Sequence, residues 1–150
     1  MAIYFYSQHD DPHGVFSNFS AHGFSVGGRH YPTSEHYFQA QKFAQSPEDY
    51  KAVATAPSPK IAADRGRERT RPLRPDWDAV KDDVMRLALR EKFAAHSALR
   101  DVLLATGDEE LIEETSSDDY WGCGTNRTGK NRLGELLMEL RESLRKKTDG

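Results

Sequence analysis

The chain has 150 residues, a net charge of −3 and a single cysteine, Cys123. This length suits one domain, expected over residues 1–150, and a lone cysteine excludes an internal disulfide. The acidic balance argues against indiscriminate nucleic-acid binding. The sequence contains no apolar run long enough to cross a bilayer and no signal-peptide pattern, so we expect a cytoplasmic protein with no membrane partner.

The first elements along the chain are short and β-prone. Residues 3–6 favour a strand, and residues 24–31 read as a hairpin. Gly27 and Gly28 fall at its centre, where a tight turn needs positive φ angles. Pro32 ends the hairpin, and Thr33 or the next residue can cap a helix.

Helices are predicted for most of the remaining chain. Serine followed by proline predicts helix starts at residues 46 and 58, and further helices are expected over 77–95, from 97 to about 107, and from about 131. Leucines from Leu133 to Leu144 recur at helical spacing and predict a buried or interfacial stripe. Residues 146–150 are expected to fray. The fold class is therefore mainly α (α+β), a compact helical domain with a small N-terminal antiparallel β element.

Glu35, Gln39 and Lys42 stand at positions i, i+4 and i+7 of the helix expected after Thr33. A helix places all three on one narrow face. There the carboxylate could handle a proton or hold a sugar hydroxyl, and the amine could act as a nucleophile or an anion clamp. A solvated helix face explains the same spacing, so the pattern leaves both readings open.

A basic segment interrupts this acidic protein. Residues 58–75 carry six Lys or Arg against two Asp or Glu, whereas residues 108–119 hold seven acids and no base. A local basic patch favours a specific anionic ligand over a polyanion. The alternative is a set of surface ion pairs, each worth little.

Two further segments combine ring faces with small polar groups. Asp118 and Trp121 begin a glycine-rich loop over residues 118–130, which offers a carboxylate, a flat ring and a backbone that a ligand can approach. In residues 16–19, two phenylalanines flank a serine and an asparagine. The alternatives are a surface loop and a turn anchored in the core. The six histidines form no metal motif, so no metal and no cofactor are expected.

These segments fall in an order that matches a known family. The matching residues are 16–19, 32–43, 63–67, 71–74, 77–81, 84–85, 88–89, 92–93, 103–106, 118, 120–122, 124, 129–134 and 137–141, and Cys123 is the one departure among the site motifs. Over residues 3–144 the chain resembles the NADAR, or YbiA-like, family of N-glycosidases, in particular its bacterial YbiA branch.

The resemblance implies cleavage of a bond between ribose C1 and a ring or amino nitrogen. In the YbiA branch the implied substrates are ribosylamino-pyrimidine 5′-phosphates, reactive early intermediates of riboflavin biosynthesis. Elsewhere in the family the implied substrate is ADP-ribose on guanine, in a nucleotide or in DNA. A non-catalytic module that binds ADP-ribose or a nucleotide would use the same pocket.

Family positions carry over onto Glu35, Trp77 and Asp118 as catalytic residues, with Lys42 a further candidate. We expect Glu35 and Asp118 to face each other across the pocket, without assigning acid and base between them. Substrate contacts are expected from Ser17, Asn18, Phe19, Gln39, Lys60, Arg65, Arg67, Trp121, Gly122 and Asn131. The oligomeric state is left open.

Overall fold

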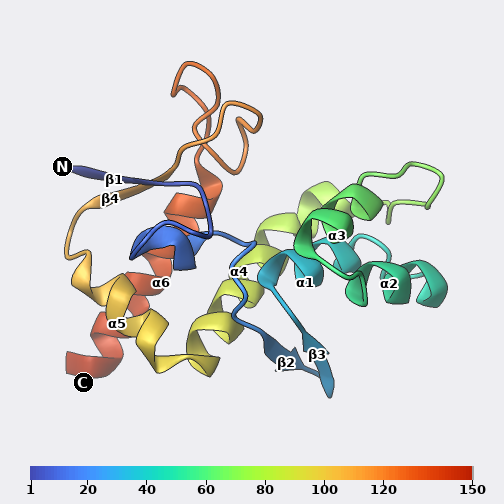
Figure 1. The fold of residues 1–150 in the computed structure, drawn as a ribbon, viewed down its shortest axis with the longest axis horizontal. Coiled ribbons are helices and arrows are strands. Elements are labelled where there is room, and N and C mark those ends of the chain that lie inside the picture. The colour runs from blue at the N-terminus through green and yellow to red at the C-terminus, as the bar shows by residue number, and fades with distance from the viewer. Residues whose placement is uncertain (150) are drawn as a thin grey trace. The chain divides into compact units, whose positions relative to one another are not determined.

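The computed structural model describes residues 1–149, with side chains through residue 147. These residues form six α-helices, one 3-10 helix and two pairs of strands (Figure 1). In chain order the elements are β1 (Ala2–Phe5), η1 (His13–Phe16), β2 (Phe24–Val26), β3 (Arg29–Tyr31), α1 (Ser34–Gln41), α2 (Pro47–Ala54), α3 (Pro59–Gly66), α4 (Trp77–Ala95), α5 (Ser97–Ala105), β4 (Glu110–Glu113) and α6 (Arg132–Asp149). The predicted mainly helical class with a small antiparallel sheet is confirmed.

The elements group into two compact units. Unit 1 combines residues 1–20 with 96–150, and unit 2 is the continuous segment 21–95. The single domain expected over residues 1–150 stays a prediction. Among the described residues, no helix is both long enough and apolar enough to cross a membrane.

Unit 2 opens with the predicted hairpin. Strands β2 and β3 pair antiparallel, with Phe24 opposite Tyr31, and Gly27 and Gly28 form the turn at φ angles of 59° and 84°. A residue with a Cβ is strained at such angles, which explains the two glycines. Phe24 and Tyr31 also contact the ring of Tyr37 on α1, so the hairpin is fixed to the helix through an aromatic cluster.

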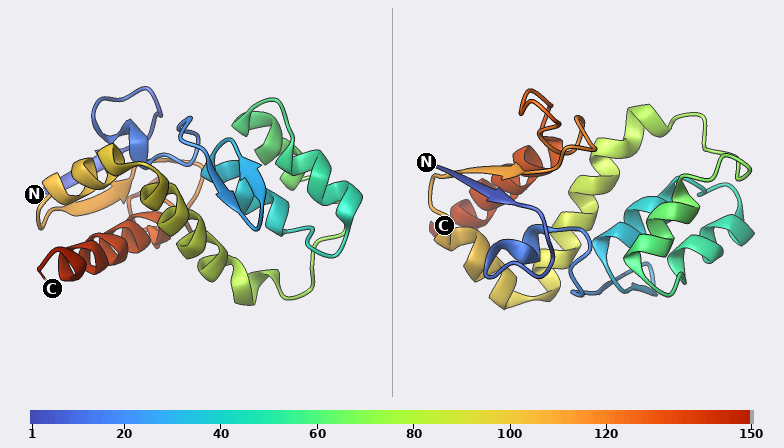
Figure 2. Two further views of the ribbon diagram at one scale, coloured as in Figure 1. Left: turned by 90° about the horizontal axis from the view of Figure 1, so that it is seen from below. Right: turned by 45° about the horizontal axis from the view of Figure 1, so that its top comes forward.

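Helices α1, α2 and α3 pack together in unit 2, and both views of Figure 2 keep them side by side. Each helix start matches a local signal. The Thr33 hydroxyl accepts the backbone N–H of His36 at the start of α1, and Ser58 does the same for α3, whose first residue is a proline. The helix starts predicted for α1, α2 and α3 are therefore confirmed.

His36 links α1 to the segment after α2. Its Nε2 donates to the carbonyl oxygen of Ala56 at 2.9 Å, so Nδ1 is left to accept from the Thr33 hydroxyl at 2.8 Å. Burial lowers the pKa of His36, because the protonated ring would lie away from water. This histidine holds the backbone together as a neutral ring.

Unit 1 contains a parallel strand pair that the sequence does not predict. Strand β1 pairs with β4 in the register Ala2 to Glu110 through Phe5 to Glu113. Leu111 is fully buried, and the acids on either side of the β4 core are partly or fully exposed. The strand predicted over residues 3–6 is present one residue earlier, as Ala2–Phe5.

Helix α6 packs against β4 and α5. Leu133, Leu136 and Leu137 are at most 2% exposed, so the first half of the leucine stripe belongs to the core of this unit. The helix continues through Asp149, beyond the point at residue 146 where fraying is expected. Residue 150 lies outside the described residues.

Candidate active site

Helix α1 presents its polar stripe to the protein interior. Glu35, Gln39 and Lys42 are 8%, 4% and 7% exposed. The solvated helix face is therefore excluded. Burying three polar side chains along α1 and its C-cap costs free energy of desolvation, which favours a functional role for them.

Gln39 orients Glu35. Its Nε2 donates to Glu35 Oε1 at 2.8 Å, whereas its own Oε1 is buried with no hydrogen-bond partner among the described residues. Gly66, the last residue of α3, lies directly against this amide. A Cβ built at Gly66 would be 2.1 Å from Gln39 Oε1, so the close approach of α3 to α1 requires glycine.

Lys42 occupies the C-cap of α1, with its ammonium group among rings and cations. Its Nζ contacts the Gly66 carbonyl oxygen at 3.5 Å and lies 5.9 Å from the ring centres of both Phe38 and Trp77. Trp77, at the start of α4, packs edge-on against Phe38, with the two ring centres 5.1 Å apart. Trp77 is thus buried beside Lys42.

Burial and neighbouring charge lower the pKa of Lys42 from 10.5 to about 8. Loss of hydration is the largest cause, and the positive charge of Arg69 is the next. Glu35 opposes the shift, while Arg67 and Lys81 add to it. An amine with this pKa is uncharged often enough near neutral pH to act as a base or nucleophile.

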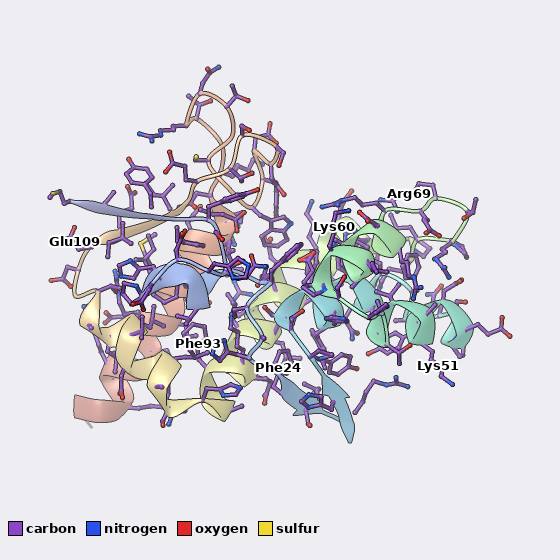
Figure 3. All side chains as sticks on the ribbon, viewed as in Figure 1. Phe24, Lys51, Lys60, Arg69, Phe93 and Glu109 are labelled. Atoms are coloured by element: carbon purple, nitrogen blue, oxygen red, sulfur yellow. The ribbon has the colours of Figure 1, made fainter. Side chains whose placement is uncertain are left out.

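The basic side chains of residues 58–75 contact different partners. Arg65 Nη1 donates to the carbonyl of Ala52 at 2.7 Å. Lys60 and Arg67 both pair with Asp64, at 3.1 and 3.9 Å, on an exposed face. Figure 3 labels Lys60 on α3 and Arg69 in the segment that follows it.

Arg69 is the member of this segment that reaches the Gly66 carbonyl, at 3.1 Å. The sequence prediction does not include Arg69, Gly66 or Lys81, because nothing in the order of the six bases distinguishes the one nearest Lys42. Arg69 is the base that lies beside Lys42 because α3 ends at Gly66.

In unit 1, Asp118 shapes the loop that it begins. One of its oxygens, Oδ1, accepts the backbone N–H groups of Tyr120 at 2.9 Å and Trp121 at 2.8 Å. The Trp121 ring meets Tyr120 edge-on at 4.9 Å. Glu35 and Asp118 belong to different units, so the pocket that they are expected to share stays a prediction.

Two other residues of unit 1 that are predicted to contact the substrate, Asn131 and Gly122, form hydrogen bonds within the fold. Asn131 has a positive φ of 52°, donates to the Leu111 carbonyl and accepts the N–H of Glu113, which ties β4 to the start of α6. Gly122 is buried, and its carbonyl oxygen accepts the N–H of Asn131.

The segment with two phenylalanines forms a tight turn after η1. The Ser17 hydroxyl accepts the N–H of Phe19, and Phe16 is fully buried against Phe5. Asn18 and Phe19 are partly exposed. The turn therefore leaves Asn18 and Phe19 as the accessible members of this segment, while Phe16 serves the core.

A change at Gly66 should test the contact between α3 and α1. Gly66→Ala is expected to lower the free energy of unfolding by about 1–3 kcal/mol through overpacking, although alanine in a helix normally stabilises by about 0.5–1 kcal/mol. Urea unfolding measures the effect. In a Gln39→Ala background, which lacks the colliding amide, the same change should cost less than it does in the parent. An unchanged or higher midpoint for Gly66→Ala alone would contradict the contact.

Comparisons with known proteins bear on this arrangement. Residues 4–145 match the NADAR domain. The chain is 55% identical to the N-glycosidase YbiA of Shigella boydii over 143 residues, which cover 95% of this chain and 88% of that protein. It is 42% identical to a riboflavin biosynthesis protein of Vibrio vulnificus, over 95% of this chain and 38% of that protein. The NMR structure of Escherichia coli YbiA matches with a TM-score of 0.89 at 51% identity, over 99% of this chain and 87% of that chain.

The helical fold and its small antiparallel sheet match those of the solved YbiA structure, and the chain belongs to the NADAR family. The family resemblance predicted from the sequence is confirmed. With its close relatives named N-glycosidases, the protein is an enzyme of that class, a hydrolase acting on N-glycosyl bonds.

Proposed function

We propose that this enzyme hydrolyses the bond between ribose C1 and nitrogen in ribosylamino-pyrimidine 5′-phosphates, and so removes reactive intermediates of riboflavin biosynthesis in the cytoplasm. The observation that carries the proposal is the buried group of Glu35, Gln39 and Lys42 beside Trp77. The relative named as a riboflavin biosynthesis protein supports the choice of substrate.

The chemistry of this bond matches a buried carboxylate. Breaking the bond between C1 and nitrogen builds positive charge on C1 and the ring oxygen, and a nearby carboxylate stabilises that charge. Glu35, held by Gln39, takes this role or orients the attacking water, and Asp118 takes the other. The rings of Trp77 and Trp121 enclose the flat base and exclude water.

The substrate phosphate requires positive charge. Lys60, Arg65 and Arg67, together with the backbone after Gly129, remain the proposed phosphate contacts. Arg65 already donates to Ala52, and Lys60 already pairs with Asp64. Arg67 is two-thirds exposed, and its 3.9 Å contact with Asp64 is the loosest of these, so Arg67 is the base best able to turn toward a phosphate.

Lys42 has two possible roles. As a cation it neutralises phosphate or tunes Glu35. As a neutral amine it attacks C1 of the ring-opened sugar. The bond from Lys42 Nζ to C1 then forms as the bond from C1 to the base nitrogen breaks, and the departing amine takes a proton. Water then hydrolyses the imine, which returns the free lysine and the sugar aldehyde. Borohydride would trap this imine, so an absent adduct at Lys42 in the presence of substrate would leave the cation role.

The test of the proposal offers the purified protein two kinds of substrate. Release of ribose 5-phosphate from the pyrimidine intermediates supports the proposed function. Release of ADP-ribose from modified guanine, as nucleotide or DNA, would replace it with ADP-ribosyl glycohydrolase activity. Tight binding of ADP-ribose with no cleavage of either substrate would instead identify a binding module.

Two variants of Asp118 separate its charge from its structural bonds. Asp118→Asn keeps an oxygen that can accept the N–H groups of Tyr120 and Trp121, so turnover should fall about 100-fold or more while the melting temperature stays near the parent value. Asp118→Ala also loses both bonds and should lower stability by about 1–2 kcal/mol. If Asp118→Asn turns over at the parent rate, the residue serves the loop alone.

A further inference from the structure

We infer that Arg69 is a positioning residue for Lys42, sharing the Gly66 carbonyl with the lysine and holding a second positive charge beside its amine. The contact itself is independent of the substrate. Its catalytic consequence rests on the proposed function, in which Lys42 is a candidate clamp or nucleophile.

The shared carbonyl follows from the way α3 ends. Gly66 is the last residue of the helix, and carbonyl groups in a last turn lack helical partners. This one receives Lys42 Nζ at 3.5 Å from α1 and Arg69 Nη1 at 3.1 Å from the segment after α3. Because both nitrogens contact one oxygen atom, the two cationic groups are held close together.

Two cations on one acceptor favour loss of a proton from one of them. Arginine stays protonated at any ordinary pH, so the lysine is the group that loses its proton. The charged groups acting on Lys42 are Glu35 on α1, Arg67 and Arg69 after α3, and Lys81 on α4. Arg69 is the largest of these charge effects, and Glu35 is the one that opposes it.

The consequence is a usable fraction of neutral amine. With a pKa of about 8, about one Lys42 in ten is uncharged at pH 7, against fewer than about one in a thousand at the ordinary value of 10.5. Burial gives the larger part of the shift. Arg69 adds a part that depends on charge, and this part can be removed by mutation or screened by salt.

The experiment measures the titration of Lys42 without any substrate. Trace acetylation between pH 6 and pH 11, followed by peptide mass spectrometry, gives the apparent pKa of each lysine. Arg69→Gln should raise that of Lys42, so that its labelling at pH 8 falls several-fold. Arg69→Lys keeps the cation and should stay near the parent.

Arg71→Gln provides the matched control. It removes the same charge from the same segment, but Arg71 pairs with Asp49 and Glu68 and is not among the charges acting on Lys42. Equal titrations for the parent and Arg69→Gln, or an equal shift in Arg71→Gln, would overturn the inference.

A second measurement uses the parent protein and needs no variant to fold. Arg69 is exposed, so 1 M salt should screen it and raise the pKa of Lys42. A titration that does not respond to salt would also overturn the inference. A protein with no N-glycosidase activity but the expected titrations would refute the proposed function and leave the role of Arg69 intact.

Discussion

Glu35→Gln is expected to slow cleavage of the N-glycosidic bond by about 10²–10⁴-fold while the protein remains folded. Glutamine has the shape of glutamate, and its side-chain oxygen can still accept the N–H of Gln39 that Glu35 Oε1 accepts at 2.8 Å. The variant therefore keeps the local geometry and removes the negative charge. That charge is what stabilises the cationic transition state or activates water.

Release of ribose 5-phosphate gives the rate, and thermal unfolding checks the fold. Glu48→Gln is the matched control, because it makes the same change at an exposed residue in the first turn of α2. It should keep the parent rate. Near-normal turnover by Glu35→Gln would remove Glu35 from the catalytic residues and leave it a buried partner of Gln39.

Lys42→Met is expected to make the protein more stable at pH 7 and to abolish its activity. Burial and neighbouring charge together lower the pKa of Lys42 from 10.5 to about 8, which corresponds to a cost of about 3 kcal/mol in the folded state. Methionine has a similar length and no charge, so it removes this cost. The Gly66 carbonyl keeps a donor, because Arg69 also contacts it.

The gain should depend on pH in a defined direction. The folded pKa lies below the unfolded one, so between pH 8 and pH 10.5 the unfolded chain binds more protons, and the parent becomes more stable as pH rises. The advantage of Lys42→Met is therefore full below about pH 8 and disappears above about pH 10.5.

Urea unfolding at pH 7 and above pH 10.5 measures this difference. Lys51→Met, at an exposed position on α2, is the control and should gain nothing at either pH. A Lys42→Met variant that is less stable than the parent at pH 7 would mean that the contacts of the ammonium group outweigh its burial.

Most of the helices could be predicted from the sequence because their signals are local. Thr33, Ser58 and the prolines at the starts of α2 and α3 act within one turn of the chain. Strand β4 could not be predicted, because it lies in an acidic stretch and its partner β1 is at the other end of the chain. No short-range pattern carries that pairing.

The same limit applies to the candidate site. The spacing of Glu35, Gln39 and Lys42 predicts a shared face, and the structure adds that the face is buried. Spacing could not select Arg69 from six nearby bases, because its contact depends on where α3 ends. Nor could it foresee that Asn131 would tie β4 to α6 with both ends of its amide.

The pairing of β1 with β4 has a consequence for the order of folding. Its partners are about 100 residues apart, so forming it closes a long loop, whereas unit 2 is continuous and its elements contact near neighbours in the chain. During synthesis from the N-terminus, residues 21–95 leave the ribosome before β4 exists. Helix α1, with Glu35 and its C-cap Lys42, can thus pack within unit 2 before β4 is available to pair with β1.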